Sequence, residues 1–161
     1  MKPTATQGYT SDMLAPSHNS AIATTAAARV YTLDVPMIPG KTGPVPPLTE
    51  NARLHHFERN RRVQLIRNRV YAAALTARIP QAKHLTVTLH YAPGDNRRRD
   101  EDNLVPTLKA ACDALARGKR RDWVGLELVP DDTPEHMTKN MPIIHPGKGP
   151  RRLWLEIEAT P

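Results

Sequence analysis

Two acidic motifs supply residues that could bind a metal ion: Asp100 with Asp102, and Asp131-Asp132 further along the chain. In an extended backbone, side chains two residues apart point the same way, so Asp100 and Asp102 can face one spot. Two like charges about 4 Å apart repel by about 4 kcal/mol at an effective dielectric near 20. A hard cation offsets this repulsion, since Mg²⁺ is typically bound by one or two carboxylates together with water and substrate phosphate. The spacing therefore favours a Mg²⁺ site, with Mn²⁺ as the alternative ion.

A run of arginines, Arg97-Arg98-Arg99, directly precedes Asp100. Guanidinium groups bind phosphate well, so the combination favours metal-dependent cleavage of a phosphodiester. The alternative is a solvated loop whose acidic and basic side chains pair with each other. Asp-x-Asp also occurs in the metal sites of nucleotide-sugar transferases, so the tripeptide does not identify the reaction.

The composition limits the class of protein. The length of 161 residues indicates one folded domain, and the formal net charge of +7 favours a polyanionic partner. Cys112 is the single cysteine, so an intrachain disulfide is excluded, and we expect a reducing, cytoplasmic location. No apolar run approaches the length of a membrane-spanning helix, so we expect no membrane partner.

Apolar periodicity predicts the elements that position these residues. Residues 1–27 lack it and are expected to form a disordered tail, whereas residues 28–161 form the domain. Helical spacing of apolar residues predicts helices over 56–78 and 104–115, the second with Asn103 as its N-cap and Pro106 in its first turn. Alternation and β-branched residues predict strands over 28–37, 83–91, 137–144 and 152–159. The fold class is thus α+β, with a small mixed sheet and two main helices.

Taken together, these motifs resemble the RusA-type Holliday junction resolvases. The resemblance rests on Asp100-Glu101-Asp102-Asn103-Leu104, the helix carrying Lys109-x₃-Asp113-Ala-Leu, and the Asp131-Asp132 turn before a strand, and it covers about residues 28–160. It implies a homodimeric, Mg²⁺-dependent endodeoxyribonuclease that resolves four-way DNA junctions by paired nicks during recombination and repair. By motif position, Asp100, Asp102 and Asp132 would hold the metal and Lys109 would be the essential basic residue. Asn103, Asp131 and Asp113 would support the site.

The chain departs from the family pattern in two places. Three extra residues precede Lys109, about one helical turn, which keeps Lys109 on the same helical face. The segment 116–130 is also longer than usual and could form an added hairpin or a DNA-contacting loop. Candidate DNA-contacting residues lie on the first helix, in the arginine run and in this segment: Arg61, Arg62, Arg69, Arg97, Arg98, Arg99, Lys119, Arg120 and Arg121.

Other interpretations stay open. Lys109 and Asp113, one helical turn apart, could form a simple helical ion pair. The same acidic site could serve a flap or fork nuclease, and a basic dimer could bind branched DNA without cutting it.

Overall fold

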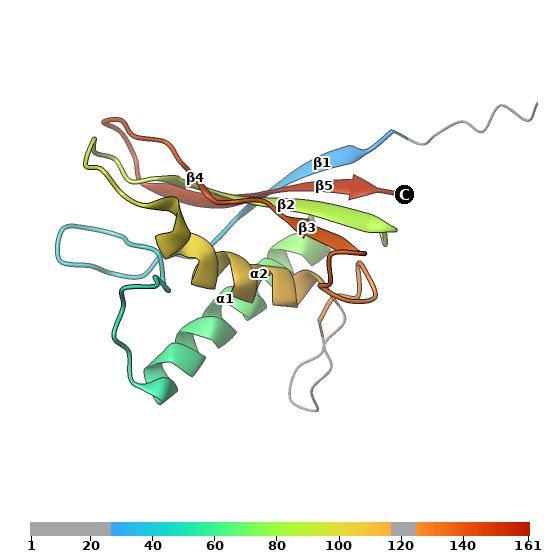
Figure 1. Cartoon of the computed structure of the whole chain (residues 1–161), viewed down its shortest axis with the longest axis horizontal. Helices are drawn as coiled ribbons and strands as arrows, with labels where there is room; N and C mark the ends of the chain where they lie inside the picture. The colour runs from blue at the N-terminus through green and yellow to red at the C-terminus, as the bar shows by residue number, and fades with distance from the viewer. Residues whose placement is uncertain (1–26, 117–124) are drawn as a thin grey trace, which may run out of the picture.

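The structure is a computed structural model that describes residues 27–116 and 125–161. Within these residues a five-stranded mixed sheet carries two helices on one face (Figure 1). The strands β1 (Arg29–Asp34), β5 (Arg152–Thr160) and β2 (His84–Ala92) are antiparallel neighbours in that order. Two short strands, β3 (Met137–Lys139) and β4 (Ile143–Ile144), run parallel to the other edge of β2.

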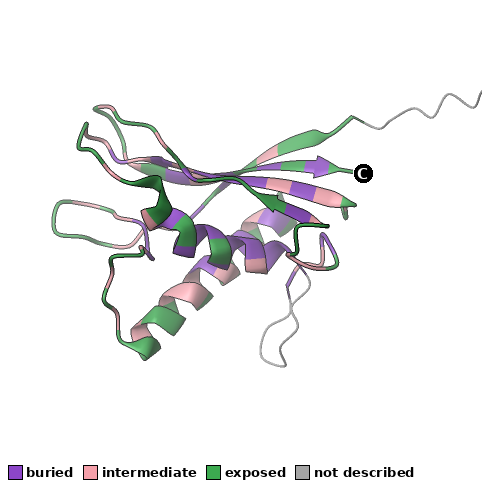
Figure 2. Cartoon of the chain, in the orientation of Figure 1, coloured by how far each residue is buried: buried purple, intermediate pink, exposed green. Residues whose placement is uncertain are grey.

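The helices are α1 (His56–Thr76) and α2 (Val105–Leu115), with a 3₁₀ turn η1 (Glu101–Leu104) immediately before α2. The predicted apolar stripes are buried: Ile66, Val70 and Ala74 in α1, and Leu108, Ala111 and Leu115 in α2. They pack against each other and against the sheet (Figure 2). Burying each large apolar side chain contributes about 1.5–3 kcal/mol, which fixes the direction in which α2 presents its polar face.

Alternation along the central strands determines which face of the sheet the helices cover. Leu85, Val87 and Leu89 of β2 are fully buried, as are Leu155 and Ile157 of β5. The residues between them point to the opposite face, where no described helix lies (Figure 1). The predicted α+β class with a mixed sheet and two main helices is therefore confirmed.

The predicted boundaries of the helices and strands are correct within a few residues, but one predicted strand is divided into two. The strand expected over 137–144 is split into β3 and β4. Between them the Asn140 side chain donates to Thr88 Oγ1 at 2.9 Å, and Pro142 has no backbone N–H to offer β2. The described end of the 116–130 segment returns alongside α2, with Val129 bridged in parallel to Ala116.

Some predictions concern residues that the structure does not describe. The predicted tail lies there except for residue 27, and so do Lys119, Arg120 and Arg121. Among the described residues, no helix is both long and apolar enough to cross a bilayer.

Candidate metal and nucleic-acid site

Asp100 and Asp102 lie where the chain leaves the loop after β2 and enters the first turn before α2. Asp100 has extended backbone angles, whereas Asp102 lies inside η1, which the bond from Asn103 N–H to the Asp100 carbonyl closes at 3.3 Å. The extended geometry predicted for this pair is therefore wrong at Asp102. Both side chains are exposed, and neither carboxylate hydrogen-bonds or pairs with a described residue. They lie at the N-terminal end of a helix, where the helix dipole favours negative charge.

Asn103 does not cap α2 as predicted. Leu104 occupies the cap position with helical backbone angles, because η1 runs directly into α2. The Asn103 side-chain oxygen instead accepts a hydrogen bond from the Asn51 amide at 2.7 Å, and its carbonyl accepts from Glu50 N–H at 3.0 Å. Asn103 thus attaches the loop before α1 to the start of α2. Pro106 lies in the first turn of α2, as predicted.

The second acidic motif forms a turn before β3. Asp131 Oδ1 accepts the N–H of Asp132 at 2.8 Å, and Asp132 Oδ2 lies 2.6 Å from Lys139 Nζ. Both side chains of this ion pair are 29% exposed. Lys139 was not among the predicted site residues, although it lies two residues after the buried Met137 in β3 and so shares its face of the sheet, the one that the helices cover. A charged residue on that face was the signal that could have found it.

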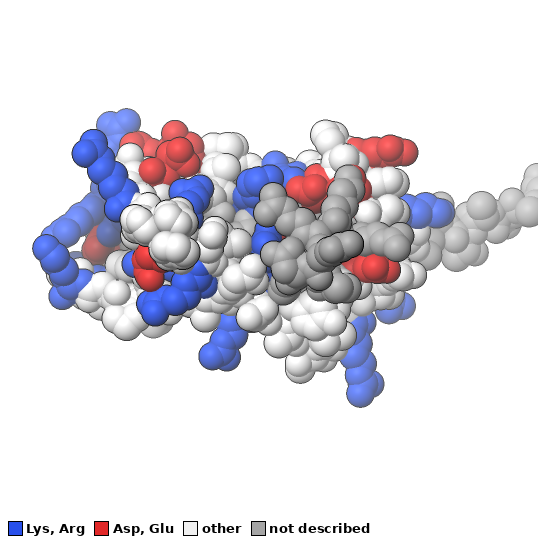
Figure 3. Space-filling view, turned by 90° about the horizontal axis from the view of Figure 1, so that it is seen from below, with Lys and Arg blue, Asp and Glu red and all other residues white. Residues whose placement is uncertain are grey.

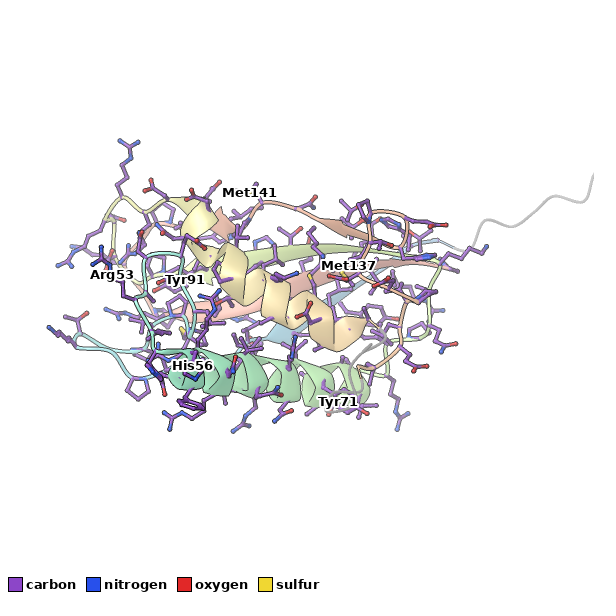
Figure 4. The ribbon with its side chains drawn as sticks, turned by 60° about the horizontal axis from the view of Figure 1, so that its bottom comes forward. Arg53, His56, Tyr71, Tyr91, Met137 and Met141 are labelled. Atoms are coloured by element: carbon purple, nitrogen blue, oxygen red, sulfur yellow. The ribbon has the colours of Figure 1, made fainter. Side chains whose placement is uncertain are left out.

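Asp132 lies toward the opposite end of α2 from Asp100 and Asp102. The charges of Asp132, Lys139, Lys109 and Asp113 all act on the buried thiol of Cys112, whose pKa is raised to about 12, mainly by burial. Cys112 follows Asp102 by ten residues, and each helical residue adds about 1.5 Å, so Cys112 lies roughly 15 Å further along the helix axis than Asp102. Met137, which follows the Asp131-Asp132 turn, accordingly lies beside the second half of α2 (Figure 4). Residues 27–116 and 125–161 contain no group of three His, Cys, Asp or Glu side chains that could hold a metal ion.

Lys109 lies on the exposed face of α2, between the two acidic motifs. It takes part in no hydrogen bond or ion pair with another described residue. Asp113 is instead paired with Arg67 of α1, with Arg67 Nη2 and Asp113 Oδ2 2.5 Å apart and both side chains about one-fifth exposed. This contact gives Asp113 a role in joining α1 to α2.

The predicted DNA-contacting arginines differ in how free their side chains are. Arg99 donates to both carboxylate oxygens of Asp95, at 2.6 and 3.0 Å. These hydrogen bonds, together with one from the Arg97 backbone N–H, hold the pKa of Asp95 well below its usual value. Arg62 is bound to Glu58 and to the Pro47 carbonyl. Arg97 and Arg98 are exposed, as are Arg61 and Arg69 on α1, although Arg61 also contacts Glu58. Lys and Arg side chains gather at the left end of the molecule (Figure 3), where the loop between β2 and α2 also lies (Figure 1).

A groove opens beside Asp100. It has a volume of about 290 Å³ and is formed by the loop before α1, the loop after β2 and the loop before β5. Asp100, Asn103 and Arg97 line it, together with Arg151 and Asn51. The structure therefore places one predicted metal ligand (Asp100), one supporting residue (Asn103) and two predicted DNA-contacting residues (Arg97 and Arg99) on a single concave surface.

Comparison of the chain with models of protein families found no match. Comparison with curated proteins found none either.

Proposed function

We propose that this chain is a Mg²⁺-dependent, structure-selective endodeoxyribonuclease of the RusA type that resolves four-way DNA junctions. The observation that carries the proposal is the exposure of two carboxylates, Asp100 and Asp102, at the positive end of α2 beside the arginine loop, where they pair with no described residue. Carboxylate oxygens that form no ion pair with a described residue stay open to a divalent cation, and Mg²⁺ is usually held by one or two carboxylates together with water and phosphate. The adjoining arginines favour a phosphate backbone.

The donor chemistry fits Mg²⁺ or Mn²⁺. Asp100 and Asp102 offer oxygen atoms alone, and two carboxylates complete a usual Mg²⁺ site when water and substrate phosphate supply the rest. Asp132 would join them as the third ligand only by giving up its bond to Lys139, with the turn before β3 and the start of α2 moving closer together on binding. When bound, the ion would polarise the scissile phosphate and lower the pKa of the attacking water.

The chain's own residues would position the strand and balance its charge. Arg97 and Arg98 are exposed next to Asp100 and would hold phosphates on either side of the scissile bond. Lys109 lies on the exposed face of α2, with its Cα–Cβ bond tilted back toward Asp102. Its ammonium group would stabilise negative charge that develops on the phosphate oxygens.

Paired nicks in opposed strands require two sites related by a two-fold axis. We therefore propose that the active form is a homodimer, in which the same surface of each copy meets its partner. The basic surface of each copy would then bind the backbone of separate junction arms, and selectivity would come from junction shape.

A second candidate is a protein that binds branched DNA without cutting it. The ion pair between Asp132 and Lys139 favours this alternative, because it neutralises one of the three predicted metal ligands. The basic surface alone would support such binding.

Cleavage of an end-labelled four-way junction tests the proposal. The experiment compares the wild type, Asp102→Asn and Glu101→Gln in Mg²⁺ and in EDTA, with a flap substrate in parallel. Glu101→Gln is a matched control, since it removes the same charge from the neighbouring exposed position in η1. We expect paired nicks that disappear in EDTA and in Asp102→Asn but persist in Glu101→Gln, with junction binding retained throughout.

Three other outcomes of this experiment would change the conclusion. Preferential cutting of the flap would identify a flap or fork nuclease. Tight binding with no cutting in Mg²⁺ would leave the non-catalytic candidate. Equal loss of cutting in both variants would refute the specific role of Asp102.

A further inference from the structure

The groove beside Asp100 has the size and lining of a pocket for a small molecule. Its volume of about 290 Å³ lies at the lower end of such pockets, which begin near 300 Å³. The three loops that form it come from distant parts of the sequence and meet around Tyr91, which is 4% exposed and forms part of the lining. Such a pocket is too small for a duplex and has room for one unit of a strand.

Arg151 is held in this pocket by closely packed backbone. A Cβ atom at Gly94 would lie 2.7 Å from the Gly149 carbonyl and 3.1 Å from Cγ of Arg151, and one at Gly43 would lie 3.2 Å from its Nη1. Both glycines have positive φ angles, +74° and +120°, so glycine is favoured there on two grounds. The guanidinium donates to the Pro44 carbonyl at 3.0 Å and to Thr42 Oγ1 at 3.3 Å.

The charge of Arg151 is not neutralised by a described carboxylate. Asp95, one of the two aspartates in the lining, is bound to Arg99 on both of its oxygens. The lining holds three arginines (Arg97, Arg99 and Arg151) and two aspartates (Asp95 and Asp100), so its net charge is 3 − 2 = +1. Such a surface attracts an anionic group, and the exposed guanidinium of Arg97 with the half-buried one of Arg151 suits a phosphate.

The rest of the lining supplies groups that suit a nucleobase. Asn51 and Asn103 share one hydrogen bond, which leaves further amide N–H and carbonyl groups for the edge of a base. Apolar side chains of Val45, Pro46 and Ile144 line the same pocket and can cover the face of a ring. Amide contacts to base edges and packing against base faces are how proteins bind unpaired nucleotides.

We propose that this pocket binds a single unpaired nucleotide of the DNA strand, next to the phosphodiester that Asp100 faces. Arg97 and Arg151 bind its phosphate, and the Asn51–Asn103 pair contacts its base. The inference rests on the proposed function, since it places the nucleotide beside the predicted metal ligands. It also explains how the protein would select branched DNA, because a paired base cannot enter a pocket of this size.

Binding of short single strands in EDTA tests this pocket without any cleavage. The probe is a fluorescently labelled thymidine hexanucleotide, followed by fluorescence anisotropy at fixed salt. Arg151→Gln and Arg97→Gln should each weaken binding about tenfold, the effect of losing one charged hydrogen bond. Arg152→Gln is the matched control, since Arg152 adjoins Arg151 but points to the opposite face of the sheet, over the Trp154 ring. Its affinity should stay within about twofold of the wild type.

Two further measurements make the result decisive: a thermal melt of each variant and the binding of an abasic strand. Arg151→Gln could loosen the loops that Arg151 joins and so lower the melting temperature. In that case Arg97→Gln carries the test on its own, because the Arg97 side chain hydrogen-bonds no described residue. An abasic hexamer of the same length should bind at least about tenfold more weakly than the thymidine hexamer, because it loses both the amide contacts to the base edge and the packing of the base against apolar side chains.

The proposal is overturned if both arginine variants bind like the wild type, or if the abasic and thymidine strands bind equally, which would leave a phosphate site alone. Failure of this pocket is distinguishable from failure of the proposed nuclease. Loss of binding in the pocket variants with no junction cutting by the wild type in Mg²⁺ would retain the nucleotide pocket and reject the nuclease. The converse result would reject the pocket alone.

Discussion

Replacing Lys139 with methionine should strengthen the binding of a divalent cation. Lys139 Nζ lies 2.6 Å from Asp132 Oδ2, so the lysine occupies the position beside this carboxylate that a metal ion would take. A unit charge and a divalent charge about 4 Å apart repel by roughly 2 kcal/mol even at the dielectric of water. The ion pair contributes no more than about 1 kcal/mol to stability at this exposure. In Lys139→Met the metal ion does not have to break this ion pair in order to bind Asp132.

We therefore expect Lys139→Met to bind Mn²⁺ at least about tenfold more tightly, which corresponds to about 1.4 kcal/mol. Isothermal titration calorimetry with MnCl₂, without DNA, measures this affinity independently of any activity. Lys83→Met is the control, because Lys83 is exposed and its described hydrogen bond is made by the backbone to Thr160. The double variant with Asp132→Asn should lose the gain.

An unchanged or weaker Mn²⁺ affinity in Lys139→Met would refute this reasoning. It would show that Asp132 does not take part in metal binding and that its contact with Lys139 is structural. A gain that survives Asp132→Asn would locate the effect elsewhere and refute it equally.

Three further predictions concern stability and reactivity. Asp113→Asn should lower the free energy of unfolding by about 2 kcal/mol in urea denaturation, because it removes the carboxylate charge that is paired with the partly buried Arg67. The control Lys109→Met should change this free energy by less than about 0.5 kcal/mol. Equal effects of the two variants would contradict the assignment of Asp113 to helix packing. Cys112, with its pKa raised to about 12 by burial, should resist iodoacetamide at pH 8 in the native protein and react on unfolding, and fast native alkylation would contradict its burial. The lowered pKa of Asp95 contributes its full stabilisation at pH values above the ordinary pKa of 3.8, and this stabilisation is lost as the pH falls through the pKa of the folded state. Asp95→Asn should therefore make the free energy of unfolding less sensitive to acid below about pH 4. An unchanged acid dependence would contradict this prediction.

Local pattern was sufficient to predict the two helices and the main strands. Leu85, Val87 and Leu89 alternate with polar residues, and a strand is the structure that buries such a set on one side. Ile66, Val70 and Ala74 recur at helical spacing and are buried together in α1. The α+β class followed from these patterns, because a strand repeats every two residues and a helix about every 3.6 residues, whatever the rest of the chain does.

The site was predictable as a set of residue types and only partly as an arrangement. The sequence indicated that Asp100 and Asp102 adjoin a basic run and could bind one metal ion, but it could not show the turn at η1. That turn is fixed to residues from another part of the chain, since Glu50 and Asn51 bond to Asn103. The extended geometry assumed for the acidic pair failed for this reason.

The sequence by itself determined the elements, the charged character of the surface and the acidic motifs, because each depends on neighbouring residues and their backbone preferences. Tertiary structure alone decided that Lys139 reaches Asp132, that Arg67 rather than Lys109 is paired with Asp113 across the helices, and that loops carrying Asn51, Arg97 and Arg151 enclose one groove. These contacts join residues that are far apart in the chain. Their geometry depends on how the helices pack on the sheet, and the free energy of that packing comes from the whole buried core, so no local spacing in the sequence could reveal it.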